Sequence, residues 1–334
     1  MTSVSDNKIP ESEETGFTGI YHLKRIWYKT INGIQNESEW QLDNALLNTL
    51  GIGLFPVFHF LHEQHPDFDS FEKWVVQQHN GSIPETVLSA CNSLFTQKAE
   101  NLFTAIPDVL SREDLEFWKE NGYIIVRNAI SKEDCAACRE AIWNYMGKKE
   151  NDPATWYTSC EGWQGIMVQL FRNPALDRNR ASPLIRKAFE QIWGHNNLIV
   201  TMDKTSFNPP VRDNFSYRGI GLHWDVSLKP PVPFGVQGLL YLTNTAAHQG
   251  AFTLIPGFHK KIDQWLADLP AGTDPRNIDL QQFGPVAIAA NEGDLIIWHN
   301  ALPHGSSPNK ADTPRLVQYL YWHPPIKEEQ LEWV

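Results

Sequence analysis

The second half of the chain consists of short apolar segments separated by turns that contain glycine and proline. Runs of four to six β-branched and aromatic residues between such turns are typical of strands rather than helices. Many short strands joined in this way predict an antiparallel fold that is closed or built from two sheets. The expected strands beyond Asp152 cover residues 166–171, 198–202, 206–208, 238–242, 251–255, 294–298 and 316–321.

Helix signals precede this strand-rich region. Ser111 is followed three residues later by Asp114, which is a capping-box pattern and predicts a helix that stops at Asn121-Gly122. A strand over 123–126 should follow, and Ser131 should cap a second helix that runs through Tyr145. A further helix is expected over 184–193, before Gly194.

The N-terminal part of the chain has a different pattern. Residues 1–16 are polar and acidic and predict a flexible tail. Apolar residues at helical spacing then indicate helices near 40–50, 55–62, 71–80 and 84–95. The predicted organisation is a tail over 1–16, a helical N-terminal extension over 17–105, and one domain over 106–334.

Composition excludes several functions. The net charge of the 334 residues is −11, which argues against binding a phosphate backbone, so no nucleic-acid partner is expected. The first residues have no basic start and no apolar run, and the chain has no stretch of about 18 apolar residues. These features predict a cytoplasmic protein that does not bind membranes.

Two groups of metal-binding residue types have weak spacing. Cys135 and Cys138 have redox or zinc spacing, but they fall inside a predicted helix without a second pair, so two packed thiols in a reducing compartment are the favoured interpretation. His59, His62 and His65 recur every three residues, near Asp67 and Asp69. Residues that recur every three positions gradually leave a common face of a helix, so ordinary surface or packing histidines are favoured there as well.

The strongest chemical signal is His223-Trp224-Asp225. On a strand, residues two apart point to the same face, so the imidazole and the carboxylate can hold one metal ion. A third ligand must come from elsewhere. His304 is preferred over His299 because it lies between Pro303 and Gly305, on a turn at a strand end. Two histidines and one carboxylate with open positions are the ligand set of non-haem Fe(II) oxygenases.

An arginine is expected beside this metal site. Arg315 opens the strand that follows His304, and the ends of strands joined in a hairpin lie close together. A guanidinium there can pair with a carboxylate in bidentate fashion, and Ser306 adds a hydroxyl on the same side. A chelating 2-oxo acid with a distal carboxylate would fit both parts. Taken alone, Arg315 could equally form a surface salt bridge.

From about Leu110 to Pro324 the sequence resembles the phytanoyl-CoA dioxygenase family of Fe(II)/2-oxoglutarate oxygenases. The resemblance rests on motifs that occur in the family's order. They are the helix and strand from Leu110 to Val126, the Leu222–Asp225 motif, Gln249-Gly250 with Ile255–Lys260, the Gly293–His299 strand, and His304-Gly305-Ser306 with Arg315.

The resemblance implies a fold and a set of roles. The fold would be mainly β with α, a double-stranded β-helix (jelly-roll) core flanked by helices. His223, Asp225 and His304 would bind Fe(II), and Arg315 with Ser306 would bind the 5-carboxylate of 2-oxoglutarate. Lys204 aligns with a co-substrate position whose residue type varies. With O2, such a dioxygenase hydroxylates its substrate and releases succinate and CO2, and an intact carboxylate at 225 favours hydroxylation over halogenation.

Other features leave alternatives open. The chain could instead be a non-catalytic jelly roll, or a cupin-like metal protein that uses no 2-oxo acid. Four residues near predicted strand ends are candidate contacts for a small-molecule or carrier-linked substrate: Trp163, Tyr217, Arg218 and Trp224. Arg218 would suit an anionic one. The N-terminal helices could form a homodimer, cover the active site or dock a carrier protein.

Overall fold

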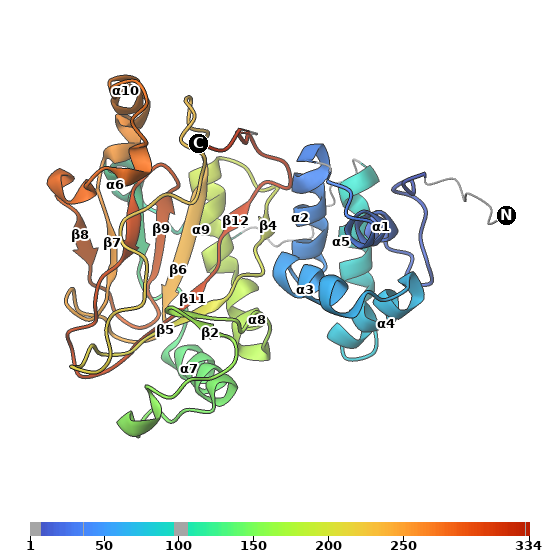
Figure 1. The fold of residues 1–334 in the computed structure, drawn as a ribbon, viewed down its shortest axis with the longest axis horizontal. Coiled ribbons are helices and arrows are strands. Elements are labelled where there is room, and N and C mark those ends of the chain that lie inside the picture. Colours follow the sequence, from blue (N-terminus) through green and yellow to red (C-terminus); the bar gives the residue numbers. More distant parts are fainter. Residues whose placement is uncertain (1–7, 36, 97–105, 331) are drawn as a thin grey trace. The chain divides into compact units, whose positions relative to one another are not determined.

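The computed structural model describes residues 8–35, 37–96, 106–330 and 332–334 (Figure 1). The chain divides into two compact units. The first comprises the described parts of Met1–Thr104 together with Asn197–Met202 and Pro324–Lys327. The second comprises the described parts of Ala105–Asn196, Asp203–His323 and Glu328–Val334.

The first unit is helical around an apolar core. Its elements are α1 (Leu23–Ile31), η1 (Glu37–Glu39), α2 (Trp40–Thr49), α3 (Leu54–Gln64), α4 (Phe68–Gln78), α5 (Glu85–Thr96) and the short strand β4 (Ile199–Val200). The four helices expected in this region correspond to α2–α5. Helix α1 was not predicted, because no capping side chain marks its start: His22 precedes it in a left-handed conformation.

The described part of the predicted tail contacts α1. Ser12 Oγ lies 2.8 Å from His22 Nδ1, and the Ser12 carbonyl accepts a hydrogen bond from the His22 backbone N–H. Residues 1–7 of that tail lie outside the described residues, so its mobility stays a prediction. None of the described helices alone is both long and apolar enough to cross a bilayer, although α2 and α3, bent by 101°, pass together on length and composition.

The second unit contains two antiparallel sheets that build a double-stranded β-helix (Figure 1). The larger sheet has the order β1-β9-β6-β11-β5-β3-β2, and the smaller one has the order β10-β7-β8. Their strands are β1 (Tyr123–Val126), β2 (Trp163–Gln164), β3 (Met167–Val168), β5 (Thr205–Asn208), β6 (Val236–Tyr241), β7 (Phe252–Leu254), β8 (Val286–Ile288), β9 (Leu295–His299), β10 (His304–Ser306) and β11 (Arg315–Tyr319). The strand β12 (Trp322–His323) follows.

Helices flank these sheets. They are α6 (Arg112–Asn121), α7 (Lys132–Met146), α8 (Pro174–Arg180), α9 (Pro183–Trp193) and α10 (Ile262–Ala267), with the 3-10 turns η2 (Pro153–Thr155), η3 (Phe258–Lys260), η4 (Pro275–Asn277) and η5 (Leu280–Phe283). The predicted capping box of Ser111 and Asp114 is present, and Gly122 ends α6 in a left-handed conformation. Ser131 caps α7 through the Asp134 backbone N–H.

The two sheets enclose one apolar core. The rings of Phe252 from the smaller sheet and Trp298 from the larger one lie 4.4 Å apart between centroids. The buried Tyr241 hydroxyl donates to the Ile288 carbonyl and accepts from the Phe252 backbone N–H, both at 2.9 Å. Because the Tyr241 hydroxyl both donates and accepts a hydrogen bond, it joins the two sheets without leaving a buried polar atom unpaired.

Several sequence predictions differ from the structure. The strand expected over 166–171 is reduced to β3, because the chain leaves the sheet after Val168 and enters α8, which Asn173 caps. The strand expected over 198–202 is only β4.

Cys135 and Cys138 are buried on α7, and burial raises their pKa values to about 12 and about 11. Both thiols are therefore protonated packing groups.

Candidate active site

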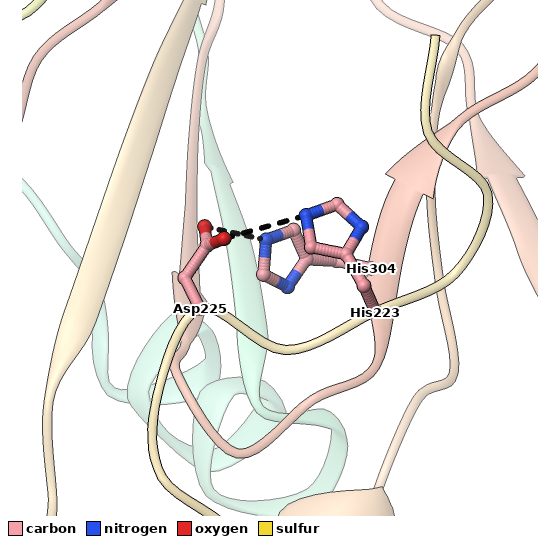
Figure 2. A group of neighbouring side chains, drawn as sticks. All are labelled: His223, Asp225 and His304. Atoms are coloured by element: carbon pink, nitrogen blue, oxygen red, sulfur yellow. Dashed lines mark hydrogen bonds and ion pairs between the residues drawn. The ribbon is translucent and has the colours of Figure 1, made fainter. Parts of the chain in front are cut away.

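His223 and His304 face each other across a single antiparallel bridge. Each backbone N–H donates to the other residue's carbonyl at 2.9 Å. His304 opens β10, whose pairing with β7 fixes its direction. The two rings lie 4.9 Å apart between centroids, and Asp225 approaches both (Figure 2). The carboxylate lies 3.4 Å from His223 Nε2 and 3.3 Å from His304 Nε2.

Backbone carbonyls set the orientation of both imidazoles. His223 Nδ1 lies 2.7 Å from the Gly221 carbonyl, and His304 Nδ1 lies 3.0 Å from the Leu302 carbonyl. A carbonyl can only accept, so each Nδ1 carries a proton and Nε2 is the ring atom left to bind a metal ion. Both free Nε2 atoms point to the region that the Asp225 carboxylate also faces (Figure 2). This tautomer is the one that a metal ligand requires.

Asp225 is held differently from the two histidines. The sequence predicts both His223 and Asp225 on one strand, but only His223 forms a bridge, and Asp225 lies in the bend that follows. Strand alternation therefore does not fix its direction. Instead, Gln237 on β6 donates from Nε2 to Asp225 Oδ2 at 2.8 Å. Burial alone would raise the pKa of Asp225, but its contacts with His223 and His304 lower the pKa by more. The net pKa lies below its usual value, so the carboxylate is ionised.

The donor set fits a divalent metal ion. The ligand atoms of His223, Asp225 and His304 all lie within 4.8 Å of one another. Two imidazoles and one carboxylate form the facial set of Fe(II) oxygenases, which leaves further positions open for small ligands. A structural zinc site would normally have four protein ligands, so a three-ligand group is typical of a catalytic centre.

Arg315 is completely buried at the start of β11. One terminal nitrogen donates to the Gly250 carbonyl at 2.9 Å and approaches Ser306 Oγ at 3.3 Å, while the other donates to Ser206 Oγ at 3.2 Å. Its Nε is buried and has no partner among the described residues. Within the described part of the chain, no carboxylate forms an ion pair with this guanidinium. A buried charge of this kind needs an anion, so the surroundings of Arg315 fit a carboxylate ligand.

Tyr217 and Lys204 lie in different places relative to this arginine. The Tyr217 hydroxyl donates to the Ser306 carbonyl at 2.7 Å, which brings Tyr217 next to the carboxylate site predicted at Arg315 and Ser306. Lys204 precedes β5, and its carbonyl accepts from the Tyr319 backbone N–H, so Lys204 stands opposite Tyr319 on the β5–β11 pair. Its role at the co-substrate stays a prediction.

The other predicted substrate residues separate into two groups. The Arg218 guanidinium is exposed and lies over the rings of Phe215 and Trp163, at 4.5 and 5.6 Å from their centroids. Trp224, in contrast, is 3% exposed, donates from Nε1 to the Ala301 carbonyl at 3.0 Å, and belongs to the core between the sheets. This placement favours a packing role for Trp224.

The alternative metal ligands do not join the site. Among the described residues, the only other cluster with metal-binding geometry is His22 with Glu39 and Asp43. Lys29 Nζ lies 2.8 Å from a carboxylate oxygen of each acid, and Arg25 pairs with Glu39 at 2.6 Å, so two internal cations already balance the two acids. The His59, His62 and His65 group forms no such cluster, because His65 ends α3 in a left-handed conformation, off the helix.

His299, the weighed alternative to His304, lies at the end of β9 against Trp118, Phe234 and His259. Its Nδ1 accepts from the Ala301 backbone N–H, and burial lowers its pKa to about 3. The unfolded chain therefore binds a proton that the folded protein does not. Stability should fall as the pH decreases from about 6.5 towards 3.

We expect His299 to remove about 3 kcal/mol from the free energy of unfolding between pH 6.5 and pH 4. Urea unfolding at several pH values measures this loss. The variant His299→Gln keeps a side-chain acceptor but does not titrate, so its stability should fall less over the same range. Equal losses in both proteins would contradict the assignment to His299.

Family comparison decides the class of the protein. The family model of phytanoyl-CoA dioxygenase (PhyH) matches residues 118–317, more than half of the chain and a span that includes all three metal-ligand candidates and Arg315. The chain belongs to the phytanoyl-CoA dioxygenase family. Family members are 2-oxoglutarate-dependent iron dioxygenases, so iron and 2-oxoglutarate are the cofactors, and the cluster of His223, Asp225 and His304 is the candidate donor set for the iron.

Individual relatives are distant. A peroxisomal phytanoyl-CoA dioxygenase of Rattus norvegicus is 24% identical over 259 residues, covering 70% of this chain and 72% of the relative. An ectoine dioxygenase of Bordetella bronchiseptica is 19% identical over 235 residues, covering 65% and 76%. Among solved structures, EctD from S. alaskensis with bound Fe aligns with a TM-score of 0.48 and 18% identity, covering 69% of this chain and 83% of that one.

Sequence reasoning missed three residues of the site. Gln237 holds the Asp225 carboxylate, while Ser206 and Tyr319 surround the Arg315 guanidinium, with Tyr319 interacting through its phenol. These residues lie on strands β6, β5 and β11 and belong to no short motif. Their signal was strand alternation: Arg315 and Tyr319 are four apart on β11 and therefore share the face of the sheet that points to the site.

Proposed function

We propose that the protein is an Fe(II)/2-oxoglutarate-dependent hydroxylase in which His223, Asp225 and His304 hold the iron and Arg315 holds the co-substrate. The observation that carries this proposal is the guanidinium of Arg315, which is buried without an anionic partner among the described residues. A non-catalytic jelly roll needs no such group, because a buried unpaired charge destabilises the fold.

The spacing along β10 suits 2-oxoglutarate. His304 and Ser306 are two apart, so their side chains share one face and are separated by roughly 7 Å along the strand. Ser306 contacts Arg315, whereas His304 belongs to the metal cluster. A five-carbon diacid can therefore reach from the metal to the arginine, with the 2-oxo acid group at one end and the distal carboxylate at the other.

Each site residue has a distinct task in the proposed reaction. When bound, iron with 2-oxoglutarate and O2 supplies an oxidant and releases succinate and CO2. The carbonyl contacts of His223 and His304 keep both Nε2 atoms available for the metal. With iron bound, the Asp225 carboxylate would serve as a ligand where a halide could otherwise bind, which favours hydroxylation over halogenation. Ser306 and Ser206 help to orient the guanidinium for the distal carboxylate.

We further propose that the substrate is a small or carrier-linked molecule that approaches past Tyr217 and Arg218. The Tyr217 hydroxyl donates to the carbonyl of Ser306, whose side chain contacts Arg315. The neighbouring Arg218 is exposed, with its guanidinium over Trp163 and Phe215. No described carboxylate pairs with Arg218, so an anionic group on the substrate would find a free cation there. The proposed cytoplasmic location and a homodimer through the N-terminal helices stay predictions.

Anaerobic titration tests the central proposal. We expect 2-oxoglutarate to tighten Fe(II) binding by the purified protein, because the co-substrate chelates the metal and pairs with Arg315. Succinate, which lacks the 2-oxo group, is the control ligand. A cupin-like protein that uses no 2-oxo acid would bind the metal equally well with or without 2-oxoglutarate. Once a substrate screen yields succinate, a product that gains one oxygen atom supports hydroxylation.

A further inference from the structure

The backbone around Asp225 is held by one distant side chain. Residues 224–228, which we name the Asp225 loop, have no ladder partner at Asp225 itself. The Arg276 guanidinium donates to the Trp224 carbonyl at 3.0 Å and to the Val226 carbonyl at 2.7 Å. It therefore binds a carbonyl of each residue that flanks the candidate metal ligand.

Arg276 is itself presented by a rigid turn. It lies in η4, where the Asp274 carboxylate accepts from the Arg276 backbone N–H at 2.9 Å and from Asn277 Nδ2 at 2.8 Å. The buried Pro275 opens the same turn. The Arg276 guanidinium itself donates to main-chain oxygens. No ion pair of Arg276 occurs among the described residues.

A second segment holds the far end of the Asp225 loop. The Leu228 backbone N–H donates to the Val334 carbonyl at 3.1 Å, and Ser227 Oγ donates to the Glu332 carbonyl at 2.6 Å. Arg276 joins this segment as well, because its guanidinium donates to the Val334 carbonyl at 3.0 Å and lies 5.0 Å from the Trp333 ring centroid. One arginine thus connects the loop, the η4 turn and residues 332–334.

We infer that Arg276 is a positioning residue for the metal centre: by fixing the carbonyls of Trp224 and Val226, it aims the Asp225 carboxylate at the two imidazoles. The inference rests on the proposed function, in which Asp225 is a metal ligand. Gln237 orients the carboxylate group, but a side-chain bond alone cannot fix the backbone from which Asp225 extends. Groups that orient metal ligands typically contribute a factor of about 10 to 100 in metal affinity.

The experiment measures Co(II) binding by the apoprotein, from the visible absorption of the bound ion and without 2-oxoglutarate. We expect Arg276→Met to raise the Co(II) dissociation constant about 10- to 100-fold and to change the absorption spectrum. Arg276→Lys keeps the charge but cannot bridge two carbonyls with one planar group, so its affinity should also be reduced. Arg139→Met is the matched control, because Arg139 also donates to a carbonyl, that of Leu242, and pairs with Glu292.

Thermal unfolding without metal accompanies each titration. An affinity for Co(II) within twofold of wild type in folded Arg276→Met would overturn the inference, and so would full affinity in Arg276→Lys, since charge alone would then suffice. Should Arg276→Met fail to fold, Arg276→Lys decides alone: unchanged affinity for Co(II) in that variant would overturn the inference.

The same titrations separate this inference from the proposed function. If 2-oxoglutarate leaves metal binding by the wild-type protein unchanged but Arg276→Met still weakens it, the oxygenase proposal fails and the positioning role stands. If 2-oxoglutarate tightens metal binding and Arg276→Met matches wild type, the positioning role fails alone. A wild-type protein that binds no Co(II) would overturn both.

Discussion

Asp225→Ala is expected to abolish 2-oxoglutarate-dependent succinate formation. The variant leaves the two imidazoles and removes the only carboxylate of the ligand set. Losing that ligand should weaken Fe(II) binding by about 4 kcal/mol, which corresponds to about 1,000-fold. Anaerobic Fe(II) titration and a succinate assay measure the two effects.

The matched control for this variant is Asp312→Ala. Asp312 is also an acid of the second unit, but its side chain is fully exposed and lies 3.8 Å from Arg212 in a surface ion pair. Such exposed pairs contribute little to stability, so Asp312→Ala should keep both metal binding and turnover. Succinate formation by Asp225→Ala above a few per cent of wild type would show that Asp225 does not hold the metal.

Arg315→Met should remove 2-oxoglutarate binding while leaving the metal site intact. Truncating one partner of a buried, hydrogen-bonded charge pair costs about 3 to 4 kcal/mol, so the affinity for 2-oxoglutarate should fall about 100- to 1,000-fold. In the protein without co-substrate, however, the guanidinium has no described anionic partner. Replacing it with an apolar side chain of similar length should therefore leave the melting temperature unchanged or raise it.

Arg180→Met provides the opposite pattern. Arg180 is similarly buried, but it already pairs with Asp177 at 2.7 Å and donates to the Asp203 carbonyl at 2.8 Å. Its loss should lower the melting temperature and leave the affinity for 2-oxoglutarate unchanged. Isothermal titration with 2-oxoglutarate and differential scanning calorimetry separate the two variants. A destabilised Arg315→Met that still binds the co-substrate would assign Arg315 a structural role instead.

The metal centre was predictable because its signals are local in the sequence. His223 and Asp225 are two apart, and His304, Ser306 and Arg315 lie within 12 residues of one another. The expected hairpin between them is wrong, because β10 and β11 belong to different sheets. Residues that support the centre are different. Gln237 and Arg276 reach Asp225 and its neighbours from positions 12 to 52 residues away in sequence. An isolated glutamine or arginine has no pattern of its own, so only the folded chain brings such contacts to light.

The fold was predictable where elements are long or capped. Ser111, Ser131 and Gly122 marked helix ends because capping is a local hydrogen-bond requirement. The short strands β8 and β10 were missed, since three residues are too few to show alternation. Helix α8 was missed although Asn173 and Pro174 carry a start signal, because the preceding apolar run was interpreted as a longer strand.

The carbonyl contacts of His223 and His304 have a consequence for metal choice. Each ring is locked by a backbone oxygen two residues upstream in its own chain, so the binding atoms are in place before any ion arrives. A metal site that is preorganised in this way does not select iron by its shape. By the usual ranking of divalent ions, nickel, copper and zinc should all displace Fe(II) at equal concentration. Protein purified on a nickel resin would then carry nickel instead of iron. The ion that it binds in a cell would depend on which divalent ions are available.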